Sequence, residues 1–363
     1  MKEKLKVGIL GGTGMVGQRF VSLLSAHPWF EVAAIAASER SAGQTYEEAC
    51  RDRWKLETPM PEAARNIKVM NVKDVSAVAE EVDFVFSAVD MSKEEIRAIE
   101  EEYARTETPV VSNNSAHRWT PDVPMVIPEI NSDHFAIIPT QKKRLGTRRG
   151  FIAVKPNCSI QSYVPALSAW REFEPYECII TTYQAISGAG KNFASWPEMV
   201  ENVIPYIGGE EEKSEQEPLK IWGRADQEGG QIVKAAGPKI SCQCLRVPVL
   251  NGHTAAVFVK FRKHPAKEEL IAALESYRGF PQEAALPLAP AQFIKYFDED
   301  DRPQVKADVD RDKGMGISIG RLREDTIYDY KFVGLSHNTI RGAAGGAVLC
   351  AETLTAKGYI EKK

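Results

Sequence analysis

The sequence is short of the features that mark several common classes of protein. Its six cysteines are scattered over 363 residues, which excludes a disulfide framework and favours reduced thiols in a cytoplasmic protein. The formal net charge is only −4, so we expect no strong attraction to nucleic acid. No stretch approaches the roughly 20 apolar residues of a membrane-spanning helix, so we expect no membrane partner. With 43% hydrophobic and 26% charged residues, the composition is typical of a globular protein with a large core.

Metal binding is not expected either. The only close pair of cysteines, Cys242 and Cys244, has no second pair of cysteines or histidines at zinc-ligand spacing. We also expect the two thiols to point to opposite faces of a strand, which would prevent them from binding one ion.

A glycine-rich turn lies near the N-terminus. The apolar strand Leu5–Leu10 runs into glycines at positions 11, 14 and 17, and apolar residues at helical spacing follow. This succession of strand, glycine loop and helix is typical of dinucleotide-binding domains, where the glycines let the backbone approach a pyrophosphate. A plain glycine-rich turn is the alternative, but the strand before it and the helix after it favour the dinucleotide site.

The residues after the second strand favour NADP over NAD. That strand is expected at Glu31–Ala37, and an NAD-binding domain places an acidic residue at its end to bind the ribose 2′-hydroxyl. Here Ser38, Arg40 and Ser41 follow, and two hydroxyls with a guanidinium suit a 2′-phosphate. NAD stays an alternative cofactor because of Glu39, whose carboxylate could turn inward while Arg40 stays in solvent.

Strands and helices alternate through the rest of the first half. Apolar strands are expected at Val82–Val89 and Pro109–Val111, and the helix between them starts at a capping box on Ser92. Such alternation predicts a mostly parallel sheet in an α/β, Rossmann-type domain. The polar loop Ser112–Trp119 follows a strand, at the sheet edge where ligands bind in such folds. We expect the basic stretch Gln141–Gly150 to be a solvated loop that crosses between domains.

The second half has a different pattern. Cys178–Tyr183 and Ala255–Phe261 are strong β runs, and they predict a mixed or antiparallel sheet in an α+β domain. After residue 337, a helix rich in small side chains is expected to pack back onto the first domain.

Cys158 stands where a predicted strand ends and a predicted helix begins. The apolar run Phe151–Val154 precedes Pro156, and Tyr163–Trp170 has helical spacing. A thiol at a helix N-terminus lies at the positive end of the helix dipole, which favours the nucleophilic thiolate. A cysteine by itself is more often a small core residue, so a catalytic role needs support from other residues.

A nucleophilic cysteine usually has a histidine beside it in space. Among the six histidines, His253 follows the turn Asn251-Gly252 and precedes an alternating strand. We expect this turn to join neighbouring strands at Cys244–Val249 and Asn251–Lys260. A lone histidine is more often structural, so this assignment also depends on its neighbours. Arg246 lies seven residues earlier, and the sequence leaves open whether the two side chains meet.

Several motifs, in order along the chain, together resemble the aspartate-semialdehyde dehydrogenase family, in the branch typical of archaea and fungi. They span nearly the whole chain and are Gly11–Gly17, Ser112–Ser115, Pro156–Ser159, Tyr183–Gly188 and Arg246–His253. Several motifs in register are far more specific than any one of them.

The resemblance implies a role for each residue of a catalytic site. Cys158 would form an acyl thioester, His253 would act as general acid and base, and Gln184 would position the substrate. By its position, Asn157 is a candidate oxyanion donor together with the backbone N–H of Cys158. The implied substrate ligands are Arg246 for a carboxylate, Arg118 and Lys213 for phosphate, and Glu210 or Glu211 for an amino group.

The resemblance also implies an NADP site and a division into domains. The implied cofactor residues are Gly11, Thr13, Gly14, Met15, Val16, Gly17, Ser38, Arg40, Ser41, Ser187, Gly188 and Asn338. We assign residues 1–154 and 338–363 to the NADP-binding domain, and residues 155–337 to a catalytic and dimerisation domain. As in the family, we expect a homodimer or homotetramer.

The implied activity is reductive dephosphorylation of L-4-aspartyl phosphate to L-aspartate 4-semialdehyde, on the pathway to lysine, threonine, methionine and isoleucine. Two alternatives stay open. Malonyl-CoA reductase resembles the same branch and would form the thioester from a different acyl donor. A non-catalytic NADP-binding sensor would lack the nucleophile or the base, yet Cys158 and His253 are both present. N-acetyl-glutamyl-phosphate reductase usually has Pro-Gly-Cys, and this chain has Pro156-Asn157-Cys158 instead.

Overall fold

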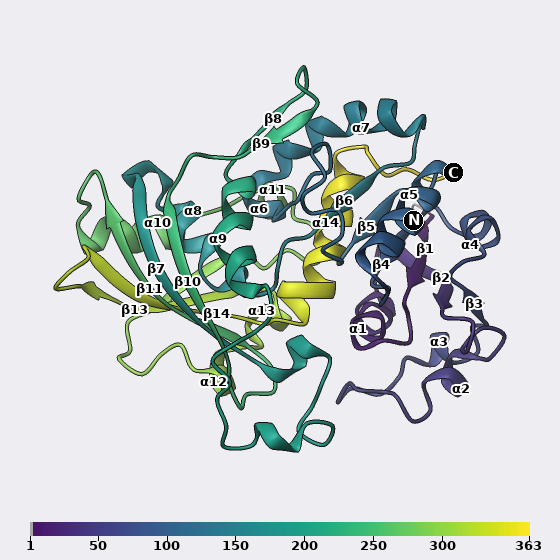
Figure 1. The fold of residues 1–363 in the computed structure, drawn as a ribbon, viewed down its shortest axis with the longest axis horizontal. Helices are drawn as coiled ribbons and strands as arrows, with labels where there is room; N and C mark the ends of the chain where they lie inside the picture. The colour runs from purple at the N-terminus through teal and green to yellow at the C-terminus, as the bar shows by residue number, and fades with distance from the viewer. Residues whose placement is uncertain (1–2) are drawn as a thin grey trace.

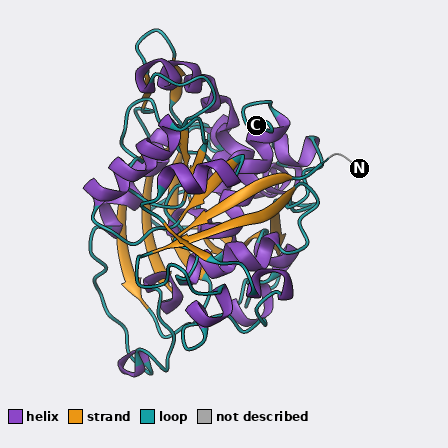
Figure 2. Cartoon of the chain, turned by 90° about the vertical axis from the view of Figure 1, so that its right-hand side faces the viewer, coloured by secondary structure: helices purple, strands orange, loops and turns teal. Residues whose placement is uncertain are grey.

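The structure is a computed structural model that describes residues 3–363. Two six-stranded sheets form its two halves, and helix α14 (Gly345–Ala356) lies between them (Figure 1). A view from the side shows strands in the interior, with helices and loops around them (Figure 2). Among residues 3–363, no helix is both long and apolar enough to cross a membrane.

The first sheet is entirely parallel, with the strand order β3-β2-β1-β4-β5-β6. Its strands are β1 (Leu5–Leu10), β2 (Phe30–Ala37), β3 (Val69–Asn71), β4 (Phe84–Ser87), β5 (Val110–Ser112) and β6 (Ile152–Val154). Its helices are α1 (Met15–Leu24), α2 (Tyr46–Cys50), α3 (Glu62–Arg65), α4 (Val75–Glu81), α5 (Lys93–Arg105), α6 (Pro128–Asn131) and α7 (Ile138–Leu145). The α/β prediction for this half is confirmed.

The second sheet is mixed, as predicted, with the order β10-β7-β11-β14-β13-β12. The pairs β10–β7 and β12–β13 are parallel, and the other pairs are antiparallel. Its strands are β7 (Pro175–Gln184), β10 (Lys239–Arg246), β11 (His253–Phe261), β12 (Ile294–Phe297), β13 (Ile317–Glu324) and β14 (Tyr330–Ser336). A separate pair consists of β8 (Arg224–Asp226) and β9 (Gln231–Val233).

Helices and short 3-10 turns connect these strands. The α-helices are α8 (Val164–Ala169), α9 (Glu210–Ile221), α10 (Lys267–Ser276), α11 (Phe280–Glu283), α12 (Val305–Asp308) and α13 (Arg311–Gly314). The 3-10 turns are η1 (Ser132–Ile137), η2 (Ser159–Ser162), η3 (Arg171–Phe173), η4 (Ile186–Ala189) and η5 (Pro197–Met199). Trp170 follows α8 and packs under the second sheet, with its ring centroid 5.0 Å from that of Phe332.

Helix α14 returns to the first half, as expected from its small side chains. It follows a π-helical turn (Ile340–Ala344) and is buried along Gly345–Leu354. Its apolar residues, such as Val348, share one core with Phe86 of β4 and Val111 of β5. The assigned domain boundaries, at 154/155 and 337/338, stay a prediction.

The basic stretch Gln141–Gly150 is not a single solvated loop, so that prediction is wrong. Helix α7 runs through its first half and ends at Gly146, whose φ of +74° suits glycine. Gln141 is buried on this helix and exchanges hydrogen bonds of 2.6 and 2.9 Å with the backbone of Ile152. The basic residues lie on the outer face of α7, so the sequence in this stretch resembles a charged loop although it forms an amphipathic helix.

Two predictions about β10 are also wrong. β10 and β11 do not form a hairpin, because β7 lies between them and pairs with both. Cys242 and Cys244 share one face of β10, with Sγ atoms 3.8 Å apart, because side chains two residues apart in a strand point the same way. In the described part of the chain, no group of three His, Cys, Asp or Glu side chains could hold a metal ion.

Candidate active site

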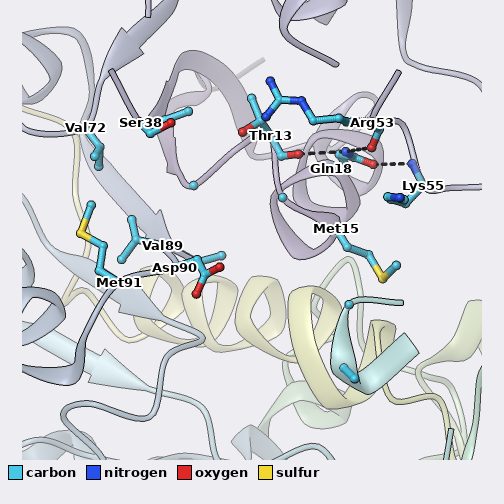
Figure 3. Close-up of a pocket in the computed structure, with 16 residues that line it drawn as sticks. Thr13, Met15, Gln18, Ser38, Arg53, Lys55, Val72, Val89, Asp90 and Met91 are labelled. Atoms are coloured by element: carbon cyan, nitrogen blue, oxygen red, sulfur yellow. Dashed lines mark hydrogen bonds between the residues drawn. The ribbon is translucent and has the colours of Figure 1, made fainter. Parts of the chain in front are cut away.

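A cavity of about 620 Å³ opens at the carboxyl end of the first sheet. Side chains from the glycine loop, from the end of β2 and from the segment after β4 surround it (Figure 3). Its lining residues are Gly11, Thr13, Gly14, Met15, Gln18, Ala37, Ser38, Arg53, Lys55, Val72, Ala88, Val89, Asp90, Met91, Ala189 and Gly190. The last two come from the second half of the chain, so both halves contribute to this cavity.

The glycine loop fits a dinucleotide because its backbone leaves no room for side chains. Gly11 has a φ of +81°, and a Cβ on it would lie 2.3 Å from the carbonyl oxygen of Ala88. A Cβ on Gly17 would lie 2.3 Å from the carbonyl oxygen of Gly11. Helix α1 begins after Gly14 without a side-chain cap, so the N–H groups of its first turn can bind a phosphate.

Only part of the predicted cofactor set lines the cavity. The residues that do are Gly11, Thr13, Gly14, Met15 and Ser38. Val16 packs against the core of the first half, and Gly17 packs against the loop itself. Arg40 is exposed and outside the lining, and Ser41 is buried beside it.

Arg53 and Lys55 also line the cavity, and neither was among the predicted cofactor residues. Arg53 Nη2 donates to Ser41 Oγ at 3.2 Å. Gln18 Nε2 donates to the carbonyl oxygens of Thr13 (2.9 Å) and Arg53 (2.7 Å), and Gln18 Oε1 accepts from the N–H of Lys55 (2.8 Å; Figure 3). These basic residues lie far beyond the second strand, so only the fold brings them to the cavity.

Cys158 and His253 meet, although 95 residues separate them in sequence. The distance from Cys158 Sγ to His253 Nε2 is 3.3 Å. Cys158 follows β6, and His253 is the first residue of β11. Within the otherwise buried stretch Phe151–Ile160, Cys158 is the residue that stays partly exposed, so a substrate can reach it.

The other ring nitrogen of His253 fixes the tautomer of the imidazole. The backbone N–H of Ala185 donates to His253 Nδ1 at 3.0 Å, which leaves the ring proton on Nε2, facing the thiol. Burial, together with the charge of Arg246, lowers the pKa of His253 to about 3. At neutral pH, His253 is therefore an uncharged hydrogen-bond donor to Cys158.

The surroundings of Cys158 act on its thiol in both directions. Burial and the nearby Glu210 raise the pKa of Cys158. The cations that lower it are Lys155, Arg118 and Arg246. The turn after Cys158 is the four-residue 3-10 turn η2, and not the longer helix expected. The prediction that a helix dipole activates the thiol is therefore wrong, and the three cations supply that attraction instead.

Glu210, the first residue of α9, is the centre of a buried hydrogen-bond cluster. Its carboxylate accepts from Asn157 Nδ2 (3.0 Å to each oxygen) and from Lys213 Nζ (2.8 Å). Gln184 Nε2 donates to the same carboxylate at 3.3 Å. Glu211 instead accepts a backbone N–H of β10 at 3.2 Å. The structure thus brings Glu210, and not Glu211, to the other predicted residues.

The side chain of Asn157 is not free to bind an oxyanion. Its Nδ2 faces Glu210, and its Oδ1 accepts from the N–H of Ser159 at 2.8 Å. Asn157 therefore supports Glu210 and the turn that carries the thiol. The backbone N–H of Cys158 stays the proposed oxyanion donor.

Arg246 and His253 come together, which the sequence left open. A Cβ on Gly188 would lie 3.2 Å from both Arg246 Nη1 and His253 Cε1. Arg246 Nη1 also donates to the carbonyl oxygen of Ala185 at 2.7 Å. The break between β10 and β11 lets two residues at an odd spacing reach one site.

Turn η4 connects the thiol with the cavity. Ser187 Oγ accepts from Asn338 Nδ2 at 2.8 Å, and Asn338 Oδ1 accepts from the N–H of Gly252 at 2.8 Å. Gly188 lies against His253, and Ala189 lines the cavity. The predicted residues Ser187, Gly188 and Asn338 therefore lie between the dinucleotide cavity and Cys158.

Arg118 is buried in the polar loop after β5. Its Nη1 lies 2.8 Å from Glu217 Oε1, and its Nε donates to the carbonyl oxygen of Lys155 at 3.2 Å. Glu217 could not be recognised from its local sequence, because a strongly charged stretch is typical of a solvated surface. Its spacing of seven residues from Glu210, which puts both on one helix face, is the signal that could have found it.

Two family models match the chain in succession. The model described as Semialdehyde dehydrogenase, NAD binding domain, matches residues 6–138. The model described as Semialdehyde dehydrogenase, dimerisation domain, matches residues 167–341. The matched dimerisation domain indicates a homo-oligomer.

Full-length relatives are similar to the whole chain. The aspartate-semialdehyde dehydrogenase of Methanothermobacter thermautotrophicus is 42% identical over 353 residues, which are 96% of this chain and 99% of that protein. The one from Aspergillus fumigatus is 40% identical over 364 residues, 98% of this chain and 99% of that one. The crystal structure of the Candida albicans enzyme with NADP covers 99% of this chain and 100% of its own, with a TM-score of 0.88 at 39% identity. The chain therefore belongs to the aspartate-semialdehyde dehydrogenase family.

Proposed function

We propose that the protein is an NADP-dependent aspartate-semialdehyde dehydrogenase, which reduces L-4-aspartyl phosphate to L-aspartate 4-semialdehyde and phosphate in amino-acid biosynthesis. The observation that carries the proposal is the 3.3 Å contact between Cys158 Sγ and His253 Nε2, beside buried cations. The relatives that match the whole chain bear the name of this enzyme.

NADP suits the cavity between the two halves. The glycine loop and the uncapped start of α1 would hold its pyrophosphate. Ser38, Arg53 and Lys55 would hold its 2′-phosphate, since cations and hydroxyls suit a dianion. When bound, NADPH supplies the hydride that reduces the acyl carbon.

Cys158 would carry the acyl group. Its thiolate attacks the acyl carbon of aspartyl phosphate, the C–S bond forms, and the bond to the phosphate oxygen breaks, so that phosphate leaves. The oxyanion on the reduced acyl carbon accepts a hydrogen bond from the Nε2–H of neutral His253, which stabilises its charge. The oxyanion then collapses to the aldehyde C=O, the C–S bond breaks, and Cys158 is released as the thiolate.

The charged residues around the thiol suit the rest of this substrate. Arg246 would bind the α-carboxylate, and Arg118 with Lys213 would bind phosphate. Glu210 suits the α-ammonium group, which aspartyl phosphate has and malonyl-CoA lacks. That difference favours aspartyl phosphate over the malonyl-CoA alternative, and the contact of His253 with the thiol argues against a non-catalytic sensor.

The proposed activity is tested in the oxidative direction. L-aspartate 4-semialdehyde and NADP should give NADPH, measured by its absorbance, at a rate that falls at least about tenfold when phosphate is omitted. Phosphate is needed because it is the acyl acceptor that releases the thioester. Equal turnover without phosphate would contradict the phosphorylating mechanism. Oxidation of NADPH with malonyl-CoA, and none with aspartyl phosphate, would instead assign the reductase.

Arg53→Ala should raise the KM for NADP about 10- to 100-fold, because loss of a charge-assisted hydrogen bond usually weakens binding by a factor of this size. The KM for NAD should change little, because NAD has no 2′-phosphate. Initial rates measured with each cofactor give the ratio of the KM for NADP to the KM for NAD. Arg40→Ala is the matched control, since Arg40 is exposed outside the cavity lining and should leave this ratio unchanged. A shift in the Arg40 variant alone would restore Arg40 as the residue that reads the 2′-phosphate.

We also propose that an exposed face of the second half binds a second copy, in a homodimer or a homotetramer of two dimers. Ile179 and Tyr183 project from β7 with 38% and 39% of their surface exposed, and Tyr206 near α9 is 71% exposed. Ile179 and Tyr183 are four residues apart and so lie on one face of β7, and exposed apolar side chains on one sheet face mark interfaces. A cytoplasmic location fits the six free cysteines, which stay reduced there.

A further inference from the structure

Helix α9 presents one face to the active site. Glu210, Ser214 and Glu217 lie on that face at spacings of four and three residues, and all three are buried. Glu210 belongs to the cluster around Asn157, and Ser214 Oγ lies 3.3 Å from Ser159 Oγ. Glu217 is fully buried, so its carboxylate binds protein groups and not solvent.

The two carboxylate oxygens of Glu217 bind two different parts of the site. Oε1 accepts from Arg118 Nη1 at 2.8 Å. Oε2 accepts the backbone N–H of Asn157, the residue just before Cys158, at 2.6 Å. One buried carboxylate thus connects the turn that carries the thiol with the guanidinium that would bind phosphate.

The same helix also holds the backbone of Arg118. Lys220, one turn after Glu217, donates from Nζ to the carbonyl oxygen of Arg118 at 2.7 Å. Arg118 Nε donates in turn to the carbonyl oxygen of Lys155 at 3.2 Å. Side chain and backbone of Arg118 are therefore fixed with respect to α9 and to the segment just before the thiol.

This arrangement matters for the reaction because the substrate sets a distance. In aspartyl phosphate one bridging oxygen separates the acyl carbon from phosphorus, so the nucleophile and the phosphate ligand must lie a fixed distance apart. A displacement of about 1 Å between reacting groups can cost a hundredfold in rate. An ion pair that served only stability would not have to join these two groups.

We infer that Glu217 is a positioning residue, which sets Arg118 against the Cys158 turn so that phosphate lies next to the acyl carbon. The inference rests on the proposed function, because it takes Arg118 as a phosphate ligand. Glu217 itself does not touch the substrate.

Glu217→Gln tests this role, because glutamine keeps the size of the side chain and offers one carbonyl oxygen in place of two carboxylate oxygens. Either Arg118 or the N–H of Asn157 then faces an amide nitrogen. The KM for phosphate should rise at least about tenfold, while the KM for NADP stays within about twofold of the wild-type value. Phosphate should also protect Cys158 from alkylation by iodoacetamide only at correspondingly higher concentration.

Glu215→Gln is the matched control on the same helix. Glu215 accepts a backbone N–H of β10, that of Cys242, at 2.9 Å, and it does not contact Arg118 or Asn157. Its kinetic constants should equal those of the wild type. If Glu217→Gln leaves the phosphate KM unchanged, or raises the KM values for phosphate, NADP and semialdehyde by one common factor, the positioning role is wrong.

Glu217→Asp keeps the test decisive if the glutamine variant does not fold. Aspartate keeps the charge but withdraws both oxygens by one methylene, so the phosphate KM should rise at least about threefold in protein with a wild-type circular dichroism spectrum. An unchanged phosphate KM in that variant would overturn the inference. The failure of the proposed function looks different, because the wild-type enzyme itself would then show no dependence on phosphate.

Discussion

Replacing Cys158 by alanine should lower the rate of NADPH formation from aspartate semialdehyde, NADP and phosphate by more than about 10⁴-fold. The reason is that the covalent route depends on the thiolate, and no neighbouring group can form a thioester in its place. Assays with a high concentration of enzyme would measure the residual rate. The variant should still bind NADP, because Cys158 does not line the cofactor cavity. A shift in the melting temperature of the same preparation on addition of NADP would detect this binding.

Cys350→Ala provides the comparison with an equal change of atoms. Cys350 is a buried free cysteine on α14 and belongs to the apolar core of the first half, so this variant should keep its activity. Substantial turnover by Cys158→Ala would remove the thioester from the mechanism. Loss of activity in both variants would point to damaged packing rather than to a lost nucleophile.

Replacing His253 by asparagine should lower kcat about 10²- to 10³-fold, the usual cost of removing a positioned donor that stabilises an oxyanion. The variant loses the Nε2–H donor, whose nitrogen lies 3.3 Å from Cys158 Sγ in the wild type. NADP binding should change little, since His253 does not line the cofactor cavity. Pre-steady-state measurements of NADPH formation would show whether the slowed step is the chemical one.

The pH dependence of the rate separates His253 from Cys158. With a pKa of about 3, His253 does not titrate near neutral pH, so the rise of rate with pH there belongs to the thiol, whose pKa is raised. A donor to the thiolate lowers the thiol pKa, so its removal in His253→Asn should move this rise to higher pH.

Lys155 should make this rise shallow. Burial lowers the pKa of Lys155 to about 7, and its positive charge, which favours the thiolate, disappears as the pH rises through that value.

His264→Asn serves as the control for His253, because the His264 side chain is 79% exposed. A kcat of His253→Asn close to that of His264→Asn would contradict the role of His253.

The parts of the fold that the sequence predicts well depend on neighbouring residues. The glycine loop after β1 and the capping box at Ser92 are local patterns, and both are found in the structure. The alternation of apolar strands and helices likewise predicts the parallel sheet. Among the site residues, Cys158 and His253 could be named because each stands at the end of an element, where a glycine or proline interrupts the regular pattern.

What the sequence did not predict depends on contacts between distant segments. Arg53 reaches the cofactor cavity through Gln18, and Glu217 reaches Arg118 from a helix that begins about 90 residues after it. β7 separates β10 from β11, although the turn at Asn251-Gly252 has the composition of a hairpin. Periodicity reports which face of an element is buried, but not which other element covers it.

Helix α14 makes the order of synthesis matter for this protein. The apolar side chains of α14, such as Leu354, share a core with Phe86 of β4 and Ala153 of β6. Between β6 and α14 a ribosome must add about 190 residues, which takes about 10–40 s at typical rates. During that time the apolar side chains of the first sheet that α14 covers in the folded protein lack their cover, which favours aggregation of the nascent chain. The core of the cofactor-binding half therefore cannot be completed until α14 has been synthesised.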